Sequence, residues 1–185
     1  MSDSIFFKRH SLRSYLDKEI PQDVLDRLFE RVRWSPSCAN NQPWRLVVVR
    51  APEQKKLVMK GIMRGNQWMA RAPVIIAMCG RKADGSVRDD NPIEYYQFDC
   101  GMAVMSLLLG AVEEGLMAHP TAGWDAVALK KTLDVPEDFH VICMIALGYE
   151  GTPDMLDEHT RKKDESPRVR KGMNEIVSYD RFSFR

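Results

Sequence analysis

The sequence lacks several features that mark large classes of proteins. It has no apolar run of the roughly 20 residues that a membrane span needs, and no apolar signal segment follows its first residues, Met1 to Ser4. Its four cysteines form no C-x-x-C pair, so we expect neither a disulfide nor a metal site. Neither sign of charge is in excess, because 27 Lys and Arg residues oppose 26 Asp and Glu residues. These absences predict a cytoplasmic protein that binds neither nucleic acid nor a membrane.

Common catalytic motifs are absent as well. The chain contains no H-E-x-x-H, G-x-S-x-G, P-loop or G-x-G-x-x-G sequence, so nothing suggests the chemistries that those motifs carry. Its 185 residues, 44% of them apolar, are enough to build one sizeable core. The composition therefore predicts a single domain, residues 1–185, whose partner is a small molecule or a protein.

A polar loop, residues 34–44 with the sequence WSPSCANNQPW, is the most distinctive stretch. Its two prolines each fix φ near −65° and remove a backbone donor. Five hydrogen-bonding side chains fall within the eight positions 35–42, whereas a plain connector needs only about two to six residues of ordinary turn chemistry. This density predicts a binding loop, and a solvated turn between a helix and a strand is the alternative.

The first group of chemically active residues lies near the N-terminus and comprises Arg9, His10, Ser11 and Arg13. Arginine matches phosphate oxygens with two parallel hydrogen bonds and keeps its charge at physiological pH. The group therefore predicts a phosphate site, and a solvated basic surface is the alternative.

Hydrophobic periodicity predicts the main elements of secondary structure. Apolar residues at helical spacing from Val24 to Val32 predict a helix that begins at Pro21 and ends before Pro36. We also expect a helix from Pro52, a helix over 99–115 capped by Asp99 and ended by Gly115, a helix over 125–133, and strands over 45–50, 74–79 and 140–149. Because helix 99–115 is apolar on every side, we expect it to be central.

Three motifs, in this order, resemble those of the nitroreductase family of FMN-dependent flavoproteins. They are R-x-S-x-R-x-Y at 9–15, I-P-x-x-x-L at 20–25 and W-S-P-S-x-x-N-x-Q-P-W-R at 34–45. The resemblance implies an α+β fold, with a central mixed β-sheet flanked by helices, in a domain-swapped homodimer. It also implies that residues 151–185 form a C-terminal arm that wraps the partner subunit.

The same resemblance implies which residues bind FMN. The family's R-x-R-K-P segment is matched from Arg168, but Gly172 replaces the proline, so both tail arginines are candidates for the phosphate. Asn66 is either a flavin contact or an exposed turn residue. The implied contacts are Arg9, His10, Ser11, Arg13, Arg168 and Arg170 for the phosphate end; Pro36, Ser37, Cys38, Asn40 and Gln42 for a flavin bound mainly by the other subunit; and Asn66, Thr121, Ala122 and Gly123 along the flavin edge.

The implied activity is two-electron reduction of a nitroaromatic, a quinone or a related electrophile by NADH or NADPH, with ping-pong kinetics. Flavin N5 would carry the hydride, so we assign no catalytic side chain. Alternatives are other flavin chemistry on the same scaffold (dehalogenation, enone reduction or oxidation) and a flavin-binding or regulatory dimer without turnover. Residues 80–97 are expected to form either a lid near the pocket or a disordered surface excursion.

Overall fold

The computed structural model describes residues 3–88 and 90–184 of the chain and contains a four-stranded sheet of order β1-β2-β4-β3. Its strands are β1 (Arg45–Val49), β2 (Val74–Gly80), β3 (Met117–Thr121) and β4 (His140–Gly148). Every neighbouring pair is antiparallel, so the expectation of a mixed sheet is wrong for the described residues. The connections explain this arrangement. After β1, and again after β3, the chain re-enters the sheet at the same end at which it left, so β2 runs opposite to β1 and β4 runs opposite to β3.

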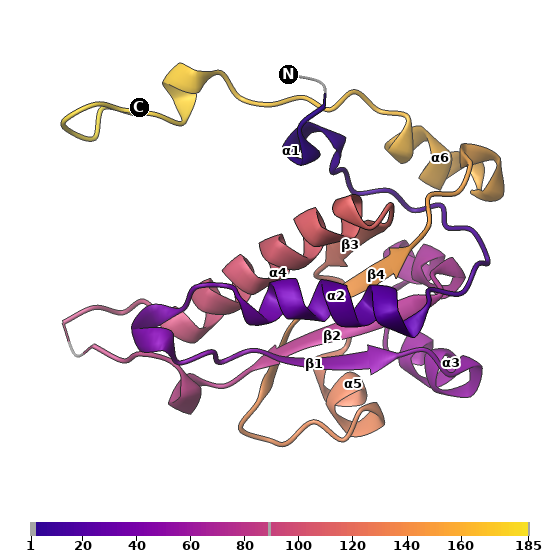
Figure 1. The fold of residues 1–185 in the computed structure, drawn as a ribbon, viewed down its shortest axis with the longest axis horizontal. Helices are drawn as coiled ribbons and strands as arrows, with labels where there is room; N and C mark the ends of the chain where they lie inside the picture. Colours follow the sequence, from indigo (N-terminus) through magenta and orange to yellow (C-terminus); the bar gives the residue numbers. More distant parts are fainter. Residues whose placement is uncertain (1–2, 89, 185) are drawn as a thin grey trace.

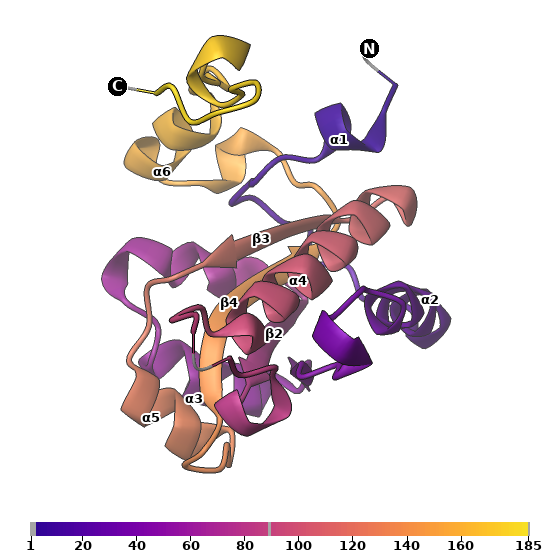
Figure 2. The ribbon, with the colours of Figure 1, turned by 90° about the vertical axis from the view of Figure 1, so that its left-hand side faces the viewer.

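Helices cover both faces of this sheet (Figures 1 and 2). They are α2 (Gln22–Arg33) and α4 (Tyr95–Glu113) on one face, and α3 (Pro52–Lys60), α5 (Ala126–Thr132) and the 3₁₀ segment η2 (Arg64–Arg71) on the other. Strand β2 is buried along its whole length. Its Ile76 and Met78 join the core under α2 and α4, and Ile75 and Ala77 join the opposite core. Its continuous apolar sequence is explained by burial on both faces.

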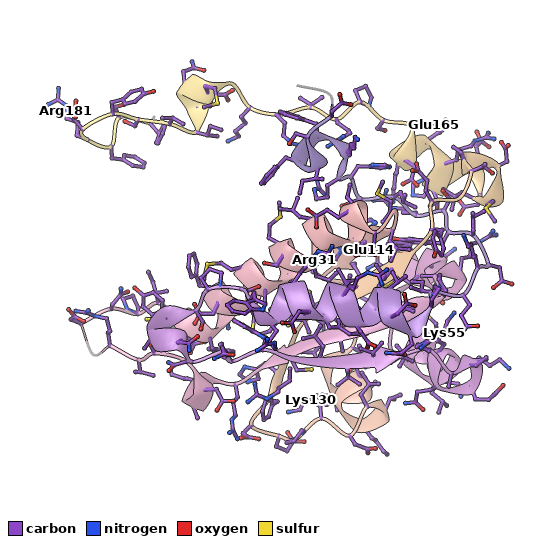
Figure 3. The ribbon with its side chains drawn as sticks, in the orientation of Figure 1. Arg31, Lys55, Glu114, Lys130, Glu165 and Arg181 are labelled. Carbon is purple, nitrogen blue, oxygen red and sulfur yellow. The ribbon has the colours of Figure 1, made fainter. Side chains whose placement is uncertain are left out.

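The packing of α2 on α4 follows the predicted amphipathic pattern. Leu25, Leu28 and Val32 of α2 are buried in the core that α4 shares. Arg31 reaches Glu114, just beyond the end of α4, with 2.8 Å between Nη1 and Oε1, and Figure 3 shows the two side chains together. The apolar stripe therefore supplies the burial, and ion pairs at the rim fix how the two helices meet.

The N-terminus of α4 differs from the prediction. The helix begins at Tyr95, and Asp99 lies inside it, fully buried, instead of capping it. The Asp99 carboxylate accepts the backbone N–H of Cys38 at 3.2 Å, so it serves another segment of the chain. The predicted C-terminal stop is confirmed, because Gly115 has a φ of +69°, a conformation that glycine adopts without steric cost.

Helix α4 packs in the core as expected, but part of its apolar surface is exposed in the single chain. Phe98 is 59% exposed and Met105 is 37% exposed. One face of α4 packs on the sheet and α2, and no described layer of this chain covers these two apolar side chains. An apolar helix face without a covering layer is a candidate interface.

The sequence analysis did not predict strand β3, helix α6 or the shorter helical segments. Strand β3 contains Pro120, which has no N–H for a ladder; the structure accommodates it because β3 is an edge strand. Helix α6 (Glu158–Asp164) is short and has no buried residue, so no apolar periodicity marks it. The remaining short segments are α1 (Ile5–Lys8), η1 (Cys38–Asn40), η3 (Lys82–Asp84), η4 (Pro153–Met155) and η5 (Met173–Glu175).

The C-terminal segment passes beside α1 and then extends away from the sheet (Figure 1). Arg168 fixes the crossing by donating hydrogen bonds to the carbonyls of Phe7 and Arg9, at 2.7 and 2.8 Å. Beyond it, Tyr179 is 84% exposed and Phe182 is 82% exposed. Within residues 3–88 and 90–184, no helix combines the length and apolar character that crossing a membrane requires.

Candidate functional site

Arginines from the two ends of the chain come together above the sheet. Arg9 follows α1, and Arg168 bonds to its carbonyl. Partial burial, and after it the charges of Arg168 and Arg170, lower the pKa of the Arg9 guanidinium below its usual value. Within the described part of the chain, none of these three side chains forms an ion pair with a carboxylate. Like charges held together without a counter-ion favour the binding of an anion.

Arg13 has a different environment from that group. Its guanidinium donates to Asp164 of α6 at 2.6 Å, and its backbone N–H donates to the same carboxylate at 2.7 Å. The guanidinium also lies 5.8 Å from the centre of the Trp68 ring. Arg13 is therefore a compensated charge that ties the N-terminal segment to α6, and the prediction that it binds phosphate stays a prediction.

In the sequence, His10 and Ser11 lie between Arg9 and Arg13. His10 donates from Nδ1 to the Lys8 carbonyl at 3.0 Å, and its Nε2 is 3.5 Å from Glu150. The Ser11 side chain is exposed to solvent. The structure thus gives His10 two protein partners and leaves the hydroxyl of Ser11 accessible to a ligand.

A second group of residues from η2 and the end of β3 lies close together in the structure. Asn66 donates from Nδ2 to Oγ1 of Thr121 at 2.6 Å and, with a longer contact of 3.4 Å, to the carbonyl of Gly123. A Cβ at Gly123 would lie only 2.3 Å from Asn66 Nδ2, so a larger residue there would displace the amide. Ala122, between the two, is exposed. We call Asn66, Thr121 and Gly123 the amide group; it places small residues and backbone at an open edge of the sheet.

Trp68 packs between Arg13 and strand β3. Its ring stacks on His119 of β3, with 4.5 Å between ring centres, and it is the same ring that Arg13 approaches. The buried indole N–H of Trp68 has no hydrogen-bond partner among the described residues. His119 donates from Nδ1 to the Leu12 carbonyl at 2.8 Å, and burial lowers the pKa of His119 to about 4. Neither residue was singled out from the sequence, because an isolated Trp or His carries no spacing signal.

The pKa of His119 predicts how stability depends on pH. In the unfolded chain the imidazole takes up a proton near pH 6.5, whereas in the folded chain it stays neutral until about pH 4. The unfolded state therefore binds more protons between these values, and the free energy of unfolding should fall by up to about 3 kcal/mol as pH drops from 6.5 to 4. Urea unfolding at a series of pH values measures this loss.

Replacing His119 with Gln should flatten the profile across that window. The matched control is His159→Gln, because His159 is an exposed histidine on α6 and its removal should leave the profile unchanged. A His119→Gln protein with the same pH dependence as the unmodified chain would contradict the role given to His119.

The polar loop of residues 36–42 is strained and internally bonded. Ala39, Asn40 and Gln42 have φ values of 51°, 57° and 48°, which costs a residue other than glycine about 1 to 3 kcal/mol. Ser37 Oγ accepts the N–H of Gln42 at 2.9 Å, and Gln42 Nε2 donates to the Asn40 carbonyl at 3.1 Å. Asp99 holds the loop further through the N–H of Cys38, and its role in binding stays a prediction.

This loop is not brought to the arginines within one chain. Figures 1 and 2 show it beside the N-terminal half of α4, whereas α1 lies above the other half. Residues 85–88 and 90–94 lie on the same side as the loop, where Ser86 accepts a hydrogen bond from Asn41 at 3.1 Å. The segment proposed as a lid thus adjoins the loop and not the arginine group, and Asp89 falls outside the described residues.

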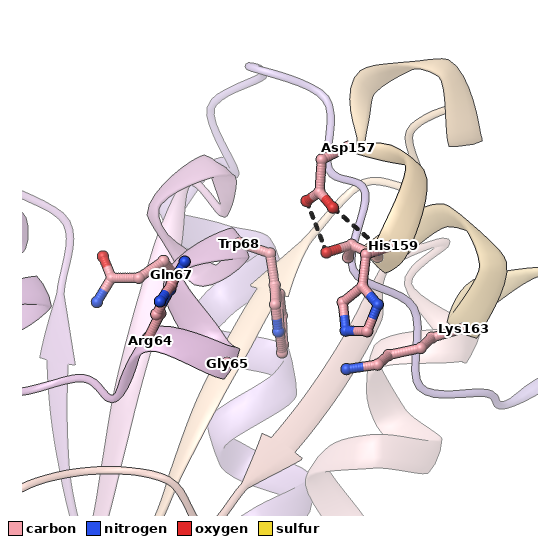
Figure 4. Close-up of a pocket in the computed structure, with 8 residues that line it drawn as sticks. Arg64, Gly65, Gln67, Trp68, Asp157, His159 and Lys163 are labelled. Atoms are coloured by element: carbon pink, nitrogen blue, oxygen red, sulfur yellow. Dashed lines mark hydrogen bonds between the residues drawn. The ribbon is translucent and has the colours of Figure 1, made fainter.

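A cavity of about 610 Å³ lies between η2 and α6. Figure 4 shows Arg64 and Gln67 on one side of the Trp68 indole, and His159 and Lys163 on the other. The residues of α6 in this cavity were missed by the sequence analysis. His159 and Lys163 are four residues apart and therefore lie on one face of α6, but nothing in the sequence links that face to Trp68.

The model of the nitroreductase family matches residues 7–65 and 52–149. The NADH dehydrogenase of Thermus thermophilus is 26% identical over 178 residues, which cover 79% of this chain and 86% of that protein. The NAD(P)H FMN reductase of Bacillus subtilis is 29% identical over 122 residues, covering 64% of this chain and 47% of that protein.

Solved structures share the fold. A crystal structure described as an oxidoreductase containing FMN is 27% identical and has a TM-score of 0.89, with 99% of this chain and 93% of that chain covered. A nitroreductase family protein from Clostridium difficile is 24% identical and has a TM-score of 0.81, with 96% and 97% covered. The match to the first of these extends over nearly the whole chain, tail included.

Proposed function

Because this chain belongs to the nitroreductase family, we propose that it is a cytoplasmic, FMN-dependent NAD(P)H oxidoreductase that reduces nitroaromatics, quinones or related electrophiles. The observation that carries the proposal is the convergence of Arg9, Arg168 and Arg170 without a carboxylate partner in the described chain. The relatives that are named for FMN support the choice of cofactor. We further propose that residues 1–185 form a single domain.

The residues present fit FMN at both of its ends. The three arginines and Ser11 suit a phosphate monoester, which offers only acceptor oxygens at neutral pH. The amide group of Asn66, Thr121 and Gly123 suits a planar polar ring, because it offers small residues at an open edge. These residues would hold the cofactor by its phosphate and by one edge of its ring system.

Bound FMN supplies the capacity to accept a hydride and to pass on two electrons. The chain's own residues bind and orient. The arginines neutralise the phosphate, and the small residues at 121–123 leave the ring edge accessible to a second molecule. No described side chain at these positions has to exchange a proton for this role, so we still assign no catalytic residue.

We propose that the active species is a homodimer of this chain. The apolar side chains of α4 and of the C-terminal segment are exposed in the single chain, with Met105 at 37%, Val169 at 79% and Phe182 at 82%. A second copy is the partner that would cover both surfaces at once and bring its own 36–42 loop to the arginines. The domain-swapped arrangement expected from the sequence is part of this proposal.

The proposed function predicts a yellow protein that releases FMN on denaturation. Anaerobic addition of NADH or NADPH should bleach the flavin absorbance, and an acceptor such as a nitroaromatic or quinone should restore it. Protein that binds FMN but is not reduced by either nucleotide would favour the non-catalytic flavin-binding dimer. Colourless protein that cannot be reconstituted with FMN would refute the cofactor assignment.

The kinetic pattern gives a second test of the same proposal. If the nucleotide and the acceptor occupy one site in turn, the nucleotide has to leave before the acceptor enters. Initial rates measured across both substrates should then give parallel double-reciprocal lines. Intersecting lines would instead indicate that both substrates are bound together.

A further inference from the structure

The cavity between η2 and α6 is lined by donors whose charges are not compensated. Arg64, His159 and Lys163 all line it, and none of them forms an ion pair with a carboxylate in the part of the chain that the structure describes. Asp157 is the one carboxylate in the lining, and it accepts hydrogen bonds from the N–H and Oγ1 of Thr160, at 3.0 and 2.7 Å. The carboxylate is thus engaged with its own helix.

Neighbouring basic residues on α6 and nearby show the contrast. Lys162, next in sequence to Lys163, donates to Glu158 at 2.7 Å, and Arg13 donates to Asp164 at 2.6 Å. Lys162 and Arg13 are therefore compensated by carboxylates, whereas the cations that line the cavity are not. Trp68 also lines this cavity, and its indole N–H is buried without an acceptor among the described residues.

Arginine, lysine and the indole nitrogen can only donate hydrogen bonds. A cavity lined in this way matches a ligand group with several acceptor oxygens and negative charge. Arg64 lies two residues before Asn66 on the same η2 segment, so the cavity adjoins the amide group proposed to meet the flavin. Its volume, about 610 Å³, is large enough for part of a nucleotide.

We propose that this cavity binds the 2′-phosphate of NADPH, so that the enzyme uses NADPH in preference to NADH. The inference rests on the proposed function, which requires a nicotinamide nucleotide as the electron donor. The two nucleotides differ by this phosphate monoester alone. A dianion with three free oxygens is the chemical group that the cavity's cationic donors, Arg64 and Lys163, match.

The direct test is calorimetric titration of the FMN-loaded protein with 2′-AMP, which carries the phosphate in question, and with adenosine, which lacks it. We expect 2′-AMP to bind at least tenfold more tightly than adenosine. Arg64→Gln and Lys163→Gln should each weaken the binding of 2′-AMP by roughly tenfold or more, the effect of losing one hydrogen bond to a charged group. Lys162→Gln is the matched control and should bind 2′-AMP as the unmodified protein does.

Two results would overturn the inference. One is equal affinity for 2′-AMP and adenosine, and the other is inorganic phosphate binding as tightly as 2′-AMP, which would indicate a general anion site. Steady-state rates give an independent measurement, since the ratio of kcat/KM for NADPH to that for NADH should fall at least tenfold in Lys163→Gln and stay unchanged in Lys162→Gln. Protein without FMN or turnover would refute the proposed function, whereas turnover with equal use of both nucleotides would refute this inference alone.

Discussion

Combining two defective variants of this chain in one dimer should restore FMN binding that neither shows by itself. One variant carries Arg9→Ala and Arg170→Ala, and the other carries Asn40→Gly and Gln42→Gly. Because the arginines and the 36–42 loop lie apart in one chain (Figures 1 and 2), we propose that each flavin site takes one group from each subunit. In the mixed dimer one of the two sites then carries all the defects and the other carries none.

Glycine is chosen at positions 40 and 42 for a structural reason. Asn40 and Gln42 have positive φ, at 57° and 48°, and glycine removes their amides while tolerating that backbone conformation. Chains with two different affinity tags allow the mixed dimer to be purified after co-expression. Its FMN content should reach about one FMN per dimer, half that of the unmodified dimer.

Mixed dimers with no more FMN than the two parent homodimers would mean that each site is built within a single chain. Sedimentation of each sample is the necessary control, because the argument requires that all three species are dimers. Homodimers that each bind FMN fully would show that these four side chains are dispensable.

Replacing Arg9 with Ala should weaken FMN binding by about 1.5 to 3 kcal/mol, or roughly 10- to 150-fold in the dissociation constant, as expected for a lost hydrogen bond to a charged group. Arg9 is the appropriate target because it has no carboxylate partner in the described chain and its pKa is lowered by burial and by Arg168 and Arg170. Its removal leaves no protein charge unpaired. Fluorescence titration of the apoprotein with FMN measures the change.

Lys56→Ala is the control for Arg9→Ala. Lys56 is a cation of α3 that is 70% exposed and pairs with Glu53 at 2.8 Å. Its removal should leave FMN affinity unchanged. Unchanged affinity in Arg9→Ala as well would show that the phosphate lies elsewhere, whereas riboflavin, which lacks the phosphate, should bind both variants alike if the assignment is right.

The sequence by itself determined the elements whose signals are local. The apolar stripe of α2, the continuous apolar runs of β2 and β4 and the positive φ at Gly115 all follow from residue spacing and from what single residues tolerate. The family was predicted correctly for the same reason, because its motifs are short and lie in a fixed order. The kinds of side chain available to an anion site could also be predicted, since guanidinium chemistry does not depend on the fold.

Tertiary structure decided which of those residues meet. Arg168 and Arg9 are 159 positions apart and come together only because the tail crosses α1, whereas Arg13, four residues from Arg9, is taken by Asp164. Asp99 lies inside α4, and its carboxylate accepts the N–H of Cys38, 61 positions away. The cavity over Trp68 required α6, which has no apolar face to mark it. Such pairings depend on how the whole chain folds around its core, and local periodicity does not predict them.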